Sequence, residues 1–212
     1  MDAYFWHQCW ENNDIGFHKS EANPLLVQHF KDLSLAENSR IFLPLCGKTL
    51  DISWLLSEGH RIVGAELSKI AVDQLFDRMA VKPDINKTGS FYHYSAQNID
   101  IFVGDIFELS RDMLGTVDAI YDRAALIALP RDLRERYTSH LLDITDSAPQ
   151  LLISIEYDQN IIPGPPFSVT GDELRKHYIN SYNLTSLKSI DIPNGRQGKC
   201  PVIENVWLLS NR

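Results

Sequence analysis

Residues 40–66 of this 212-residue chain read RIFLPLCGKTLDISWLLSEGHRIVGAE, and this stretch decides which fold we expect. Residues 40–45 form a short apolar run that ends in a Cys-Gly-Lys turn, a pattern typical of a buried β-strand. Residues 49–58 carry apolar side chains at helical spacing, and Gly59 follows them in a position that favours glycine. Residues 61–66 form a second apolar run. The stretch therefore predicts a strand, a helix and a second, parallel strand.

The rest of the chain continues this alternation. Further strands are predicted at residues 99–103, 117–121 and 151–156, and further helices at residues 68–80, 131–144 and 171–178. Two extended segments, 184–190 and 202–208, have no long helix between them and should form an antiparallel hairpin at a sheet edge. The pattern predicts an α/β fold with a mostly parallel sheet and helices on both faces.

We expect one domain over residues 1–212, because no linker, repeat or low-complexity tract interrupts the chain. Residues 1–35 look helical and lie outside the alternation, so they could form either packing or a lid. Their aromatic side chains could anchor a helix to the core or form an apolar wall around a flat ring. These aromatic residues are Tyr4, Phe5, Trp6, Trp10 and Phe17.

The composition excludes several functional classes. Hydrophobic residues make up 44% and charged residues 23%, as in soluble globular proteins. The formal net charge of −8 gives no basic footprint for a nucleic acid, and no apolar stretch is long enough to span a membrane. The first residues, MDAY, lack the pattern of a signal peptide. Three scattered cysteines without a C-x-x-C pair favour reduced thiols and a cytoplasmic location.

Gly47 and Glu66 suggest the kind of ligand that the sheet holds. Ligands of open α/β sheets bind beyond the carboxyl ends of the strands, and an acidic residue about 20 positions after the first glycine accepts ribose hydroxyls. Only one glycine stands in this turn, so the phosphate-binding pattern G-x-G-x-x-G is absent. The sequence therefore favours a nucleoside cofactor without phosphates, such as S-adenosylmethionine, over NAD or FAD. Alternatively, Glu66 merely ends a strand at the surface.

Three other residues near predicted strand ends invite both functional and structural interpretations. Asp105 could accept the exocyclic amine of adenine, or it could be an ordinary turn residue. Arg123 could pair with a ligand carboxylate or stabilise a substrate anion, or it could form a purely structural ion pair. Cys46 is interpreted as a buried filler, because no base stands at a recognisable spacing from it. The seven histidines show no paired ligand spacing, so we expect no metal site.

Four blocks of the sequence resemble thiopurine S-methyltransferases, particularly the bacterial ones, and the resemblance covers nearly the whole chain. The P-L-C-G-K block is specific to this group rather than common to class I methyltransferases. The blocks are Trp10-Glu11 with Ile15-Gly16-Phe17-His18, Pro44-Leu45-Cys46-Gly47-Lys48 with Asp51, Gly59 to Ser68, and Tyr121 to Pro130.

The resemblance implies a Rossmann-like class I fold with a seven-stranded sheet and S-adenosylmethionine as the cofactor. It implies methyl transfer to the sulfur of aromatic or heterocyclic thiols such as thiopurines, and bacterial members are also associated with selenium or tellurium species. The expected partner is thus a small aromatic thiol, without nucleic acid, membrane or metal, and we expect a monomer. The rival interpretations are a non-catalytic adenosine-ligand binder and a nicotinamide-dependent oxidoreductase on the same fold.

The resemblance also implies a set of site residues. Arg123 is expected to touch the cofactor and to act catalytically, by favouring the thiolate of the substrate. The aromatic substrate should lie beside Phe17, and Arg196 matches a late arginine near the substrate thiol. The other expected cofactor contacts are Trp10, Leu45 and Glu66, with Asp105 and Ile106 near the adenine.

Overall fold

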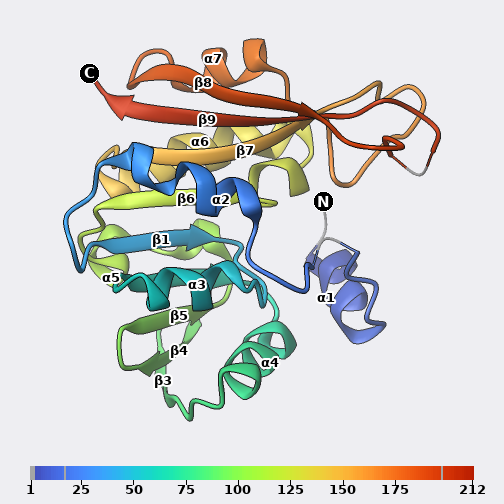
Figure 1. Cartoon of the computed structure of the whole chain (residues 1–212). Coiled ribbons are helices and arrows are strands. Elements are labelled where there is room, and N and C mark those ends of the chain that lie inside the picture. Colours follow the sequence, from blue (N-terminus) through green and yellow to red (C-terminus); the bar gives the residue numbers. More distant parts are fainter. Residues whose placement is uncertain (1–2, 17, 197) are drawn as a thin grey trace.

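A single mixed sheet forms the centre of the molecule in the computed structural model, which describes residues 3–16, 18–196 and 198–212 (Figure 1). Within these ranges the strand order is β3-β4-β5-β2-β1-β6-β7-β9-β8. The strands are Arg40–Pro44 (β1), Arg61–Glu66 (β2), Asp84–Thr88 (β3), Phe91–Ala96 (β4), Ile99–Val103 (β5), Ala119–Arg123 (β6), Gln150–Glu156 (β7), Tyr182–Asp191 (β8) and Ile203–Asn211 (β9). Strands β5, β2, β1, β6 and β7 pair in parallel, and both edges of the sheet are antiparallel.

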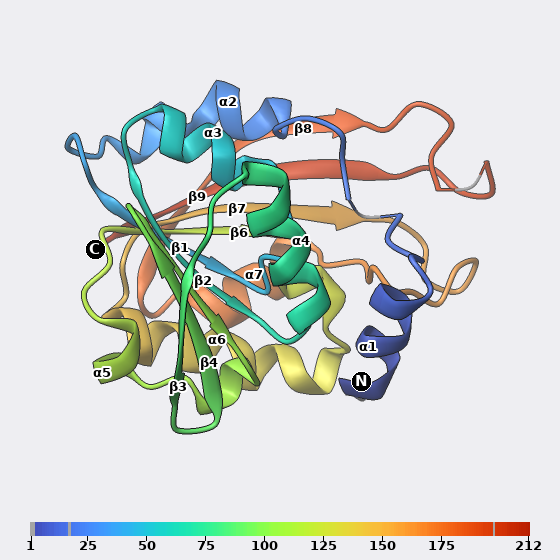
Figure 2. The same cartoon turned by 90° about the horizontal axis from the view of Figure 1, so that it is seen from below.

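Helices cover both faces of this sheet, and Figure 2 shows the two layers. One apolar core lies between the sheet and α2, α3 and α4, and the other lies between the sheet and α5, α6 and α7. Buried strands between two helical layers are the expected environment of a parallel sheet. The helices are Ala3–Glu11 (α1), Pro24–His29 (α2), Asp51–Ser57 (α3), Lys69–Met79 (α4), Arg111–Leu114 (α5), Arg131–Thr145 (α6) and Gly171–Tyr178 (α7), with short 3-10 helices at Phe30–Leu33 (η1), Ile106–Glu108 (η2) and Leu126–Ala128 (η3).

The predicted α/β alternation and the closing β8–β9 hairpin are confirmed. The strand number is larger than the seven that the family resemblance implies, because a hairpin of β3 and β4 extends the edge at β5. Every residue of β3 is exposed, so this strand carries no alternation of apolar and polar residues that a sequence pattern could reveal. Strand β6 lies two residues later than predicted, and Arg123 is its last residue rather than a residue after it.

The N-terminal region divides into two parts with different surroundings. Helix α2 and η1 place apolar side chains in the core beside α3, so this half of the predicted lid belongs to the packed body. Helix α1 instead lies beyond the carboxyl ends of the parallel strands in both views, beside the start of α4 (Figures 1 and 2). Within the N-terminal region, the described residues before Asn23, which caps α2, are therefore the ones placed to cover a site at that edge.

Candidate functional site

Strand order reverses at β1, which has β2 on one side and β6 on the other. Such a reversal opens a crevice at the carboxyl ends of the strands, where ligands of doubly wound sheets bind. The turn after β1, Glu66 at the end of β2 and Arg123 at the end of β6 all lie at this edge. The fold thus brings three of the predicted site elements together from separate parts of the sequence.

The turn after β1 adopts a backbone conformation that few residues tolerate. Leu45 and Gly47 both have left-handed φ angles, +47° and +54°. For leucine this conformation costs on the order of 1 kcal/mol, and such strain is concentrated at functional sites. A side chain at position 47 would lie 3.1 Å from the indole ring of Trp10, so glycine also permits the close packing of α1 on this turn. Gly47 is itself buried, because Trp10 covers it.

Glu66 lies beneath this turn with both carboxylate oxygens engaged. Its Oε2 accepts the backbone N–H of Gly47 at 2.7 Å, and its Oε1 accepts that of Ser68 at 2.8 Å. Burial raises the pKa of Glu66, and the hydrogen bonds from the Ser68 and Gly47 amides act against that rise. The Leu67 N–H also contributes a hydrogen bond to this carboxylate. Because the two oxygens offer about four acceptor positions, Glu66 retains acceptor capacity. Glu66 is buried and does not merely end a strand at the surface.

Trp10 closes one side of the turn. It is the buried residue of α1, whereas Tyr4 of the same helix is 66% exposed. The ammonium of Lys48 lies 5.7 Å from the centre of the Trp10 ring, within the range of a cation–π contact. Trp10 therefore presents a flat apolar surface beside Gly47 at the mouth of the crevice.

Asp105 and Ile106 follow β5, next to β2. The exposed Asp105 begins η2, and its carboxylate accepts the backbone N–H of Phe107 at 3.0 Å. Ile106 is buried, and its carbonyl oxygen lies 2.8 Å from Nε2 of His140. The structure thus accounts for Asp105 as a capping residue, and its predicted contact with adenine stays a prediction.

Arg123 enters the crevice from β6, with a side chain that is 12% exposed. Its Nη1 lies 3.4 Å from the hydroxyl oxygen of Thr49 and 3.3 Å from Oδ2 of Asp51. Among the described residues, these are the acceptors of its guanidinium. The chain turns sharply after the strand, because Ala124 has a left-handed φ of +60°. Arg123 is thus held through Nη1, and the partly buried carboxylate of Glu204 lies near enough to interact with it electrostatically.

The sequence matches the family model described as "Thiopurine S-methyltransferase (TPMT)" over residues 1–211. The chain belongs to the thiopurine S-methyltransferase family. It is 50% identical to the thiopurine S-methyltransferase of Xanthobacter autotrophicus, with 99% of both chains covered. It is 47% identical to that of Gluconobacter oxydans, with 99% of this chain and 95% of the relative covered. The family uses S-adenosylmethionine as the methyl donor.

Solved structures support the fold assignment. The 1,6-didemethyltoxoflavin-N1-methyltransferase of Burkholderia thailandensis, solved with S-adenosylhomocysteine, superposes with a TM-score of 0.65 at 14% identity. That comparison covers 99% of this chain and 87% of the other. A methyltransferase from Anabaena variabilis gives a TM-score of 0.64 at 13% identity, over 99% and 95% of the two chains. This chain therefore has a class I methyltransferase fold.

The family resemblance predicts two residues beside the substrate, Phe17 and Arg196, and the structure describes only the second. Phe17 lies outside the described residues. Arg196 lies in the β8–β9 loop, where Nη1 donates to the hydroxyl of Tyr157 at 2.5 Å and to the carbonyl of Pro166 at 2.6 Å, and Nη2 donates to the carbonyl of Pro165. Its guanidinium therefore ties this loop to the proline-rich loop after β7, and its role near a substrate thiol stays a prediction.

His18 shows that the N-terminal segment approaches the same crevice. Burial lowers the pKa of His18, and the positive charges of Lys48, Arg78 and Arg123 lower it further. Its Nε2 lies 3.1 Å from Nη1 of Arg78, so the neutral ring accepts a hydrogen bond from the guanidinium. Arg123, from β6, and His18 are thus near enough to interact electrostatically. This proximity was not predicted from the sequence.

Asp122, next to Arg123, is fully buried beneath the site and gives a prediction about stability. Its carboxylate accepts the hydroxyl of Tyr137 at 2.8 Å and the N–H of Leu126 at 3.1 Å, and burial raises its pKa from 3.8 to about 6. Because the native state favours the protonated acid, this stability contribution is full below pH 3.8 and is lost as the pH rises through about 6. In Asp122→Asn, thermal unfolding should show a stability gain over wild type that grows by about 1 kcal/mol from about pH 5 to about pH 7.5. A stability difference that stays constant over this range would contradict the burial argument.

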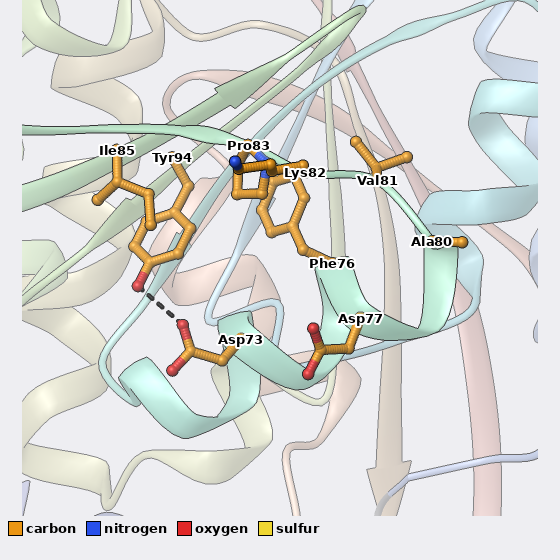
Figure 3. Close-up of a pocket in the computed structure, with 9 residues that line it drawn as sticks. All are labelled: Asp73, Phe76, Asp77, Ala80, Val81, Lys82, Pro83, Ile85 and Tyr94. Carbon is orange, nitrogen blue, oxygen red and sulfur yellow. Dashed lines mark hydrogen bonds between the residues drawn. The ribbon is translucent and has the colours of Figure 1, made fainter.

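Other parts of the described chain do not add to this site. A hollow of about 570 Å³ lies between α4 and the β3–β4 hairpin, and none of the predicted site residues lines it (Figure 3). Burial raises the pKa of the Cys46 thiol well above its usual range, which agrees with its interpretation as a filler. No group of His, Cys, Asp and Glu within the described ranges could hold a metal ion. The helices of the described residues include none that is long and apolar enough to cross a membrane.

Proposed function

We propose that this protein transfers the methyl group of S-adenosylmethionine to the sulfur of aromatic or heterocyclic thiols such as thiopurines. The observation that carries the proposal is the placement of Glu66 and Arg123 on the two sides of the turn after β1. Glu66 can accept hydrogen bonds from the ribose hydroxyls, and the positive charge of Arg123 can stabilise a substrate thiolate. The related proteins from Xanthobacter and Gluconobacter carry the name of this activity.

The residues around the turn fit a nucleoside without phosphates. Glu66 would accept the two ribose hydroxyls through its remaining lone pairs, and Leu45 and Trp10 would line the cofactor beside Gly47. Ile106 and Asp105 would lie near the adenine, at the end of the adjacent strand β5. The single glycine in the turn leaves little room for the backbone cradle that a pyrophosphate needs. This arrangement supports S-adenosylmethionine over a dinucleotide.

Arg123 would stabilise the thiolate form of the substrate, which is the form that attacks the methyl group. When bound, S-adenosylmethionine provides a sulfonium methyl group, which is a strong electrophile. A thiol must lose its proton to become the nucleophile, and a nearby guanidinium stabilises the thiolate and lowers the pKa of the thiol. The proton can then leave to solvent, without a strong general base. Arg123 would also hold the sulfur in place, since alignment of the reactants can contribute about 7–11 kcal/mol.

The substrate partner proposed here is a small aromatic thiol, bound by a monomer in the cytoplasm without nucleic acid. The acidic balance of the chain, 20 basic against 28 acidic residues, supports the absence of a nucleic-acid partner. Phe17 and Arg196 are the proposed substrate contacts, the first beside the aromatic ring and the second near the thiol.

Calorimetric titration tests the ligand class directly. S-adenosylmethionine and S-adenosylhomocysteine should bind at one site per chain, and NAD should not bind. Thiopurine turnover should follow on addition of the methyl donor. Binding of a dinucleotide instead would support an oxidoreductase, and binding of S-adenosylmethionine without turnover would support a non-catalytic binder; either result would overturn the proposal.

The N-terminal segment should respond to the cofactor product if it acts as a lid. Trp10 packs on the turn that is proposed to hold the cofactor, and the exposed Lys19 offers a trypsin site after this helix. Saturating S-adenosylhomocysteine should protect the segment and slow cleavage after Lys19, as followed by mass spectrometry of the intact chain. Cleavage at the same rate with and without ligand would instead mean that these aromatic residues only pack on the core.

A further inference from the structure

The residue that holds Arg123 is Asp51, the first residue of α3. Its side chain is 1% exposed, whereas aspartate is almost never fully buried unless it is paired. Burial of a carboxylate costs free energy unless hydrogen bonds and counter-charges offset it. An apolar residue would fill the same volume without that cost, as Ile52 and Leu55 do on the same helix. The position of Asp51 therefore requires an explanation beyond packing.

Three donors from different parts of the chain converge on the Asp51 carboxylate. Its Oδ1 accepts the backbone N–H of Asn23 at 2.7 Å, at the start of α2. Its Oδ2 accepts the hydroxyl of Tyr121 at 3.1 Å and Nη1 of Arg123 at 3.3 Å. Tyr121 and Arg123 are alternate residues of β6, so their side chains lie on the same face of the sheet. The carboxylate thus fixes two side chains of β6 and the end of the N-terminal segment.

We propose that Asp51 is a positioning residue that holds the Arg123 guanidinium toward the reacting sulfur. This inference rests on the function proposed above for Arg123. Arginine has five N–H donors in a planar fork. The contacts of Nη1 with Asp51 and Thr49 restrain the guanidinium and leave its other donors for a ligand. His18 and Glu204 also lie near enough to Arg123 to interact with it electrostatically. Without that contact the guanidinium could adopt several rotamers, and its charge would no longer lie at one point in the crevice.

The variant Asp51→Asn separates this role from packing. The amide keeps the volume of the side chain, and its oxygen can still accept the Asn23 amide. Its NH₂ group then faces the Arg123 guanidinium. Both groups are hydrogen-bond donors, and the ion pair is lost because asparagine carries no charge. We expect kcat for a thiopurine to fall by about tenfold, with the Kd for S-adenosylhomocysteine changed by less than about threefold. We also expect activity to recover in part as the pH rises and the thiol ionises without help.

A double-mutant cycle with Arg123→Ala shows whether Asp51 acts through Arg123. If it does, Asp51→Asn should slow the Arg123 variant by less than about twofold, because the group that it positions is already absent. The matched control is Asp73→Asn on α4, since Asp73 also accepts a tyrosine hydroxyl, from Tyr94 at 2.9 Å (Figure 3). Asp73 also pairs with a cation, Lys69, at 2.7 Å. This control should retain wild-type kcat and a wild-type pH profile.

Each outcome either supports or overturns the inference. A loss of kcat that is the same at every pH, or the same with and without Arg123, would make Asp51 a residue of the fold alone. A slow Arg123 variant together with a fully active Asp51→Asn variant would overturn this inference and leave the proposed function intact. Full activity of the Arg123 variant would overturn this inference and the role proposed for Arg123, whereas thiopurine methylation itself would stand. If Asp51→Asn does not fold, Asp51→Glu keeps the charge but shifts it by one methylene, and it should show the same pH-dependent loss in weaker form; wild-type kinetics there would overturn the inference.

Discussion

Replacement of Glu66 by alanine is expected to weaken the binding of S-adenosylhomocysteine by at least about a hundredfold. Two charge-assisted hydrogen bonds to the ribose are proposed at this carboxylate, each worth about 1.5–3 kcal/mol. The variant also removes the acceptor of the Gly47 amide at 2.7 Å, which holds the turn after β1 against β2. Isothermal titration gives the Kd, and circular dichroism shows whether the fold survives.

Two further variants make the Glu66 result interpretable. Glu66→Gln keeps the volume and one acceptor, so it should fold and still lose about tenfold or more in affinity. Glu58→Ala removes an exposed carboxylate at the end of α3, before the amino end of β2, and should bind the ligand like wild type. Wild-type affinity in both Glu66 variants would mean that the carboxylate only supports the turn and does not hold the ribose.

Replacement of Arg123 by lysine should lower thiopurine methylation by at least about tenfold, or about 1.4 kcal/mol of transition-state stabilisation. Lysine keeps the positive charge but has no planar fork, so it cannot pair with Asp51 on one edge and a thiolate on the other. Raising the pH should restore part of the rate, because more of the thiol is then ionised. The measurement is a pH profile of kcat and kcat/KM for both proteins.

The matched control is Arg61→Lys, at the amino end of β2 and far from the crevice, which should leave the profile unchanged. A rate loss of equal size at every pH would make Arg123 a residue that binds or positions without stabilising the thiolate. Full activity of the lysine variant would remove Arg123 from the mechanism.

Sequence patterns predict those parts of the fold in which burial follows a simple period. The alternation of strands and helices is confirmed, and so is the placement of Glu66 beside the Gly47 turn. In the helix at residues 68–80, apolar spacing favours Ile70, Ala71, Leu75 and Met79 as the inward face, and this expectation is wrong for Ile70. Ile70 is 38% exposed, and Val72 and Phe76 are buried in its place. Phe76 stacks on Tyr94 of β4 with ring centroids 5.8 Å apart, so the buried face of α4 includes a contact with a strand that the sequence pattern did not reveal.

The residues that the sequence did not reveal are those whose role depends on contacts between distant segments. Asp51 appeared only as part of a family motif, although its spacing of four from Leu55 places it on the buried face of α3. A carboxylate on an apolar helix face is a signal that could have singled it out. Its partners Asn23 and Arg123 lie 28 and 72 positions away, and no local pattern relates them. The approach of His18 to Arg123 is hidden from the sequence for the same reason.

The most direct test of the central claim is to identify the atom that receives the methyl group. The purified protein is incubated with 6-mercaptopurine and S-adenosylmethionine labelled with deuterium in the methyl group, and the product is analysed by mass spectrometry and NMR. We predict one labelled methyl group on the exocyclic sulfur, formed together with one equivalent of S-adenosylhomocysteine. A product methylated on a ring nitrogen, or unreacted thiopurine beside bound cofactor, would contradict the account.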